Sequence, residues 1–121
     1  MLFQWTAIRE GHFRLLRCSP YATTEQLSFT LESYPIGHSP PYAIVDYASA
    51  SGIRDSRVSL NGRACMIPME AAEALRRAHR LDPRCLLWMD CLCVRWNDEH
   101  ESDMQRRWMS SICEHTTAVI T

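Results

Sequence analysis

The segment from Cys85 to Val94 constrains the fold of this chain more than any other, because it is its most apolar stretch. It has the sequence CLLWMDCLCV, and its one charged residue is Asp90. A nearly continuous apolar run of this length is typical of a strand that is buried on both faces, as in parallel sheets. We therefore predict an interior strand over residues 85–94.

Shorter patterns elsewhere predict further strands. Apolar stretches, some of them alternating with polar residues, predict a hairpin over 58–67 and single strands at 13–18, 27–34, 42–47 and 116–121. The pair Asn61-Gly62 lies in the middle of the hairpin segment and is a strong signal for a two-residue turn.

Two segments predict helices. Residues Met69 to Leu81 are rich in alanine and follow Pro68, which suits the first turn of a helix. A second helix is expected to begin near Asp98, with Glu101 three residues further on as in a capping box. The second half then alternates helix and strand, which predicts an α/β fold with a mainly parallel sheet flanked by helices. The first half, with its hairpin, predicts an antiparallel addition at the N-terminal side, and 121 residues suit one domain over 1–121.

Composition excludes some classes of function and favours others. Lys and Arg total 13 and Asp and Glu total 14, so the chain lacks the basic surplus that a nucleic-acid-binding protein uses. No stretch approaches the roughly 18 apolar residues of a membrane span. The first 13 residues include Arg9, Glu10 and His12 and do not resemble a secretory signal. We expect a cytoplasmic protein without a membrane span or a nucleic-acid partner.

Six cysteines are compatible with two interpretations in a reducing compartment. Cys91 and Cys93 lie two residues apart in the apolar run, so on a strand both would point to one face. No CxxC pair or zinc-type histidine spacing accompanies them. We favour buried structural thiols over metal binding or redox chemistry and expect no metal site.

Asp90 and Glu101 are the candidate catalytic residues. A carboxylate inside an apolar strand is costly unless it is paired or lies at an open end, and ligands of open α/β sheets bind beyond the carboxyl ends of strands. Asp90 fits that position, or else it caps the loop that follows. Glu101 either caps its helix or faces the same cleft, where two carboxylates can bind sugar hydroxyls or transfer protons.

Four further residues are candidates for ligand binding. Tyr42, Asp46 and Tyr47 belong to a neighbouring predicted strand and either line the cleft or serve in the core and in a loop cap. Trp96 lies in a polar segment, where it either contacts a partner or packs against the domain. The chain contains no GxGxxG, GxxxxGK[ST], HExxH or GxSxG motif, so short motifs do not determine its function.

The order of these segments resembles the heterokaryon-incompatibility (HET) domain of filamentous fungi. That family shows a Tyr-x-Ala-Leu-Ser-Tyr-x-Trp-Gly strand, an Asn-Gly hairpin, a helix ending in Ala-Leu-Arg, Leu-Trp-Ile-Asp-x-x-Cys-Ile-Asn-Gln, and Glu-Arg-x-x-Gln-Val-x-x-Met. The matching positions here are Tyr42-Ala43-Ile44, Leu60-Asn61-Gly62, Ala74-Leu75-Arg76, Leu87-Trp88-Met89-Asp90, Asp98, Glu101, Gln105 and Met109. The family's Ser-Tyr-x-Trp-Gly is replaced by residues 45–49, its Asn-Gln by Arg95-Trp96, and its C-terminal part is expected to be missing.

This resemblance implies a role in self/non-self recognition with programmed cell death as the output, through a protein partner or self-association. HET domains are also thought to be remote relatives of Toll/interleukin-1 receptor (TIR) domains, some of which cleave NAD with a glutamate. By that analogy the fold is TIR-like, Glu101 is the acid and Asp90 orients the ribose, with NAD as a substrate and no cofactor. Three hypotheses follow from the resemblance: a non-catalytic signalling module, a NAD glycohydrolase, and a shortened product without a role of its own.

Overall fold

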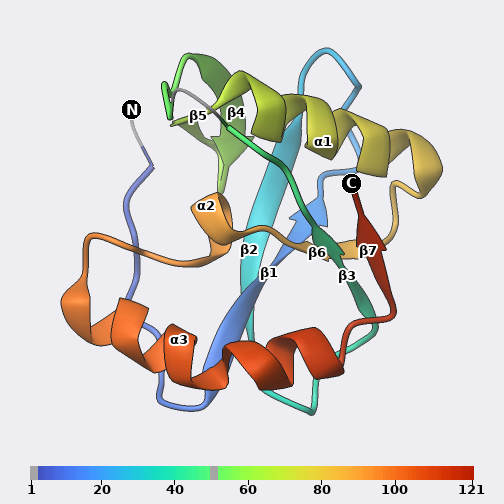
Figure 1. Ribbon diagram of the computed structural model, residues 1–121. Helices are drawn as coiled ribbons and strands as arrows, with labels where there is room; N and C mark the ends of the chain where they lie inside the picture. The colour runs from blue at the N-terminus through green and yellow to red at the C-terminus, as the bar shows by residue number, and fades with distance from the viewer. Residues whose placement is uncertain (1–2, 50–51) are drawn as a thin grey trace.

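The computed structural model describes residues 3–49 and 52–121 and contains a sheet with helices packed on it (Figure 1). The elements in chain order are β1 (His12–Cys18), β2 (Ser28–Pro35), β3 (Tyr42–Val45), β4 (Ser56–Leu60), β5 (Arg63–Ile67), α1 (Met69–Leu81), β6 (Leu86–Trp88), α2 (Asp90–Cys93), α3 (Glu99–Glu114) and β7 (Ala118–Ile120). The predicted α/β class is confirmed. No helix within the described ranges is both long and apolar enough to cross a membrane.

The sheet is mixed, so the prediction of a mainly parallel sheet was wrong, and a TIR-like arrangement is not confirmed. Its strand order is β5-β4-β2-β1-β6-β3-β7. β4 with β5, β1 with β2, and β1 with β6 pair antiparallel, whereas β2 with β4, β3 with β6, and β3 with β7 pair parallel. The antiparallel β1–β2 contact is the longest and runs from His12 opposite Pro35 to Cys18 opposite Phe29. The antiparallel part is therefore central to the sheet, because the N-terminal strand β1 pairs with β6 in its middle.

The predicted strand over 85–94 was also wrong in its second half. The strand β6 ends at Trp88, and Asp90 begins the short helix α2. Backbone bonds close this turn, from Cys93 N to the Met89 oxygen at 2.9 Å and from Val94 N to the Asp90 oxygen. Cys91 and Cys93 therefore do not share one face of a strand, although both are buried. A continuous apolar run cannot distinguish a buried strand from a buried helical turn, since either conformation buries every side chain.

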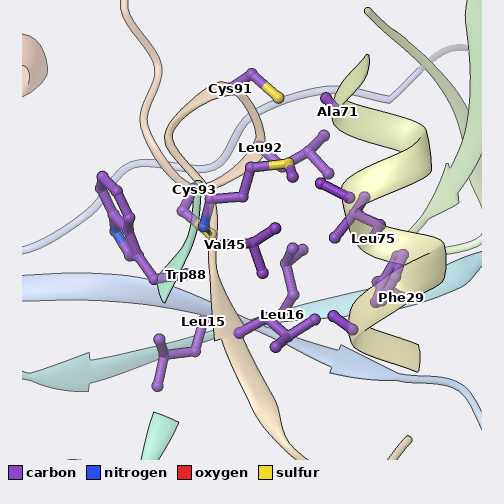
Figure 2. Packing of buried hydrophobic residues seen from close by; sticks show 14 of the residues in the cluster. Leu15, Leu16, Phe29, Val45, Ala71, Leu75, Trp88, Cys91, Leu92 and Cys93 are labelled. Atoms are coloured by element: carbon purple, nitrogen blue, oxygen red, sulfur yellow. Dashed lines mark hydrogen bonds between the residues drawn. The ribbon is translucent and has the colours of Figure 1, made fainter. Parts of the chain in front are cut away.

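The helix α1 agrees with the prediction at both ends, with Pro68 as its N-cap. Its buried face covers one side of the sheet, where Leu75 lies in one cluster with Leu16, Phe29 and Val45 (Figure 2). The helix α3 lies across the opposite face (Figure 1). There the hydroxyl of Tyr42 donates to the Ile112 oxygen of α3. The sheet is thus buried between helices, as the sequence predicts.

The predicted hairpin is confirmed as β4 and β5, joined at Asn61-Gly62. Both turn residues have positive φ, 54° at Asn61 and 77° at Gly62, which matches the turn type that Asn-Gly favours. The side chain of Asn61 has a second role, because its Oδ1 accepts a hydrogen bond of 2.9 Å from the backbone of Leu31 in β2. The turn therefore anchors the hairpin to the next strand of the sheet.

Replacing Asn61 by Ala is expected to lower the free energy of unfolding by about 1.5–3 kcal/mol, since alanine is strained at positive φ and the bond from Leu31 is lost. Replacing it by Gly removes the same bond to Leu31 without strain, so the expected loss is only about 0.5–1 kcal/mol. Urea denaturation of the two variants beside the unmodified chain measures both values. Equal losses for Ala and Gly would show that the turn conformation contributes nothing to the effect.

Candidate functional site

Glu101 lies in the first turn of α3, where the local sequence begins the helix as predicted. Asp98 is the N-cap, and its Oδ1 accepts the hydrogen bond of the Glu101 backbone N–H at 3.0 Å. In a complete capping box the Glu101 side chain would also accept a bond from the Asp98 N–H. Here that N–H donates to the Arg95 oxygen instead. The carboxylate of Glu101 is thereby left to bind partners other than its own N-cap.

Those partners are Arg14 and the backbone of Arg95. The Glu101 Oε1 accepts from Nη2 of Arg14 at 2.6 Å, and Oε2 accepts from Nη1 at 2.7 Å, so the two side chains form a bidentate pair. The Arg95 N–H donates to Oε2 at 2.6 Å. The pair is enclosed by the protein, since 4% of the Arg14 side chain and 7% of the Glu101 side chain are exposed.

Arg14 also contacts two other parts of the chain, the end of α2 and the N-terminal segment. Its Nη1 donates to the Cys93 oxygen at the end of α2, and its Nη2 donates to the Thr6 oxygen in the N-terminal segment. Its guanidinium lies 4.9 Å from the ring centre of Trp5. Arg14 was not among the residues for which the sequence predicted a role. The signal was an arginine between the apolar residues of a predicted strand, but nothing in the sequence indicates its partner 87 positions away.

Asp90 occupies the first turn of α2, close to other polar groups. Its Oδ1 is buried and has no hydrogen-bond partner within the described residues. Burial raises the pKa of Tyr47, and a hydrogen bond with the Cys91 side chain and the neighbouring Asp90 carboxyl raise it further. Burial likewise raises the pKa of Cys91, to about 11. These two groups therefore stay protonated at neutral pH beside the Asp90 carboxyl.

Trp96 is another predicted binding residue that contacts Asp90. Its Nε1 donates to the Asp90 backbone oxygen at 3.0 Å, and the guanidinium of Arg106 lies 5.4 Å from the ring centre. One face of Trp96 borders a cavity of about 330 Å³. The residues that line this cavity are Trp5, Arg54, Cys91, Val94, Arg95, Trp96 and Asn97. Neither Asp90 nor Glu101 is among these lining residues.

The other predicted binding residues are divided between the core and the surface. Tyr42 is buried on β3, packs edge-to-face on Phe13, and has its pKa raised to about 12 by burial. Asp46 is exposed just after β3, and only Tyr47 of these three lies beside Asp90. The structure thus brings Tyr47, Asp90 and Trp96 together, and it places Tyr42 in the core under α3.

The part of the chain that the structure describes contains no group of three or more His, Cys, Asp or Glu residues arranged to hold a metal ion. All six cysteines are free thiols. The tryptophans and arginines around the 330 Å³ cavity offer aromatic faces for stacking and guanidinium groups for anions.

The chain matches a known protein family. The sequence profile of the family described as "Heterokaryon incompatibility protein (HET)" matches residues 30–121. No curated protein matches the chain, and no solved structure does. The matched range covers most of β2 and every element after it, and it includes both candidate carboxylates, whereas Arg14 lies before it.

Proposed function

Because this chain belongs to the heterokaryon incompatibility (HET) family, we propose that it is a non-catalytic module of fungal self/non-self recognition. In this proposal it acts in the cytoplasm and signals programmed cell death by binding a protein partner or a second copy of itself. The observation that carries the non-catalytic part is the position of Glu101, whose carboxylate is held by Arg14 inside the protein.

A catalytic acid has to come within hydrogen-bond reach of its substrate. Both oxygens of Glu101 already accept short bonds from Arg14, and Oε2 accepts a further bond from the Arg95 N–H. To reach a substrate, Glu101 would have to break a buried ion pair, which costs about 3–5 kcal/mol when one charge is left without its partner. The bonds of Glu101 instead join β1 to the start of α3, which is a structural role.

The replaced family residues support the same proposal. Residues 45–49 stand where the family has Ser-Tyr-x-Trp-Gly, and Arg95-Trp96 stands where it has Asn-Gln. Both replacements fall close to Asp90, since Trp96 donates to the Asp90 backbone oxygen and Tyr47 lies beside the Asp90 carboxyl. A protein that needs only its fold and its surface for signalling tolerates such changes, because partner binding does not depend on a complete set of catalytic groups.

A second candidate function is NAD hydrolysis, and one observation favours it. The Oδ1 of Asp90 is buried without a partner, and the next residue, Cys91, lines the cavity that Trp5 and Trp96 also line. Buried polar atoms without partners are rare and often belong to binding or catalytic sites. In this alternative the indole rings stack on a base of NAD, Arg54 and Arg95 bind its phosphates, and Asp90 accepts a bond from a ribose hydroxyl.

Incubating the purified chain with NAD and measuring free nicotinamide separates the two candidates. We expect no release above the buffer rate, also at high protein concentration and with a crowding agent that promotes self-assembly. Release that is lost in Asp90→Asn would contradict the non-catalytic proposal. The matched control is Asp103→Asn, because Asp103 is exposed and only pairs with Arg106 on the surface. Glu101→Gln is informative in this assay only where circular dichroism shows that the variant is folded.

Expression in hyphae of a filamentous fungus tests the signalling part. We expect the unmodified chain and Asp90→Asn to cause growth arrest and cell death equally, with cellular NAD unchanged before death. Cell death that requires Asp90 and follows a fall in cellular NAD would contradict the non-catalytic proposal and support NAD hydrolysis. A complete absence of death in both strains, with the protein detected by immunoblot, would contradict a role in cell-death signalling.

A further inference from the structure

A thiol and an imidazole meet on the side of the fold where β1 and α1 end. The Sγ of Cys18, the last residue of β1, lies 3.4 Å from Nδ1 of His79 in the last turn of α1. The two residues are 61 positions apart, so the tertiary structure brings them together. At this distance the ring nitrogen can accept the thiol proton, which is the arrangement by which a histidine activates a cysteine. Neither residue has a part in the proposed function.

Cys18 and His79 line a cavity of about 570 Å³. The other residues around it are Arg17, Ser19, Pro20, Ala22, Pro83 and Arg84, and no Asp or Glu is among them. The guanidinium of Arg17 forms a salt bridge with Glu32, whereas Arg84 makes no salt bridge within the described residues. The cavity therefore offers a guanidinium without a salt bridge beside the Cys18 thiol, which suits a small molecule that carries a carboxylate.

We propose that Cys18 is a modification site at which a small anionic disulfide, such as oxidised glutathione, forms a mixed disulfide with the assistance of His79. The Nδ1 of His79 accepts the proton of the Cys18 thiol, and Sγ attacks one sulfur of the disulfide. A bond forms between Sγ and that sulfur, and the original S–S bond breaks. The leaving thiolate takes the proton from His79, so Cys18 is oxidised, the released half is reduced, and no further reactant is needed.

Assistance by His79 is necessary because Cys18 is a poor nucleophile by itself. Burial raises the pKa of its thiol, so the thiolate fraction at neutral pH is lower than that of a free cysteine. The remaining thiols differ in their surroundings. Cys91 and Cys93 are buried, Cys65 and Cys85 are half-buried without a contact to a histidine nitrogen in the described structure, and Cys113 is exposed. Cys113 is therefore accessible to the same reagents and has to be removed before the test.

The test measures mixed-disulfide formation in the Cys113→Ser protein with oxidised glutathione, with the modified residue identified by mass spectrometry of peptides. We expect Cys18 to be modified first and the rate to fall about 100-fold in His79→Asn, which is the lower range of general-base catalysis. A neutral probe, bis(2-hydroxyethyl) disulfide, is expected to react more slowly at Cys18. Arg84→Gln should reduce the rate with glutathione and leave that of the neutral probe unchanged.

Two results would overturn the proposal. The first is an unchanged rate at Cys18 in His79→Asn while circular dichroism shows a folded protein, because exposure alone would then explain the reaction. The second is an equal rate for the anionic and the neutral probe on the Cys113→Ser protein, which decides the matter even where His79→Asn fails to fold. Restoration of the rate in His79→Ala by added imidazole would support the proton transfer directly. Absence of NAD turnover or of cell death has no bearing on either readout.

Discussion

Replacing Glu101 by Gln is expected to lower the free energy of unfolding by about 3–5 kcal/mol, the largest effect of any substitution considered for this chain. The substitution leaves the guanidinium of Arg14 buried without its counter-charge, and Arg14 is only 3% exposed. The glutamine also loses the acceptor strength with which the carboxylate binds the Arg95 N–H. Urea denaturation followed by circular dichroism measures the change, which should appear as a lower midpoint with an unchanged slope.

The matched control for this prediction is Glu32→Gln, because Glu32 accepts from Arg17 at 2.8 Å but the two side chains are 36% and 49% exposed. An exposed pair contributes little, so we expect a loss under about 1 kcal/mol. The double variant Arg14→Met with Glu101→Leu should recover much of the loss, since it removes both buried charges. If Glu101→Gln cost no more than Glu32→Gln, Glu101 would not be held inside the protein, and the argument against its catalytic role would fail.

Replacing Leu92 by Ala is expected to lower the free energy of unfolding by about 2–5 kcal/mol, the usual range for a fully buried leucine. Leu92 has no exposed surface and belongs to the same cluster as Val45 and Leu75 (Figure 2). Its position depends on the turn of α2, which directs the side chain into the core directly after β6. Thermal and urea denaturation give the change, with near-ultraviolet circular dichroism as a check of tertiary packing.

The control for Leu92 is Leu81→Ala at the end of α1, where the leucine is 72% exposed and the expected change is within about 0.5 kcal/mol. The two substitutions remove the same atoms, so their difference isolates the contribution of burial. Similar losses for both variants would mean that Leu92 is not buried in the core, which would contradict the helical turn at residues 90–93.

The candidate site was only partly predictable from the sequence. Asp90 and Glu101 were recognised as carboxylates in unusual surroundings, and the family resemblance that they helped to establish is confirmed by the match over residues 30–121. Their assignment as a catalytic pair stays a prediction. What the sequence did not indicate is Arg14, because the reason for a buried arginine lies in a partner from a distant element. The Cys18–His79 contact was missed for the same reason.

The sequence by itself determined the family, the α/β class, the helix α1, the N-cap of α3 and the hairpin at Asn61-Gly62. The helix, the N-cap and the hairpin turn each depend on interactions between residues a few positions apart, so a local sequence pattern is enough to predict them. Only the tertiary structure decided the strand order, the helical turn at Asp90 and the ion pair of Arg14 with Glu101. The physical reason is that burial stabilises an apolar residue in a strand or a helix alike, and the partner of a buried charge depends on which distant elements pack together.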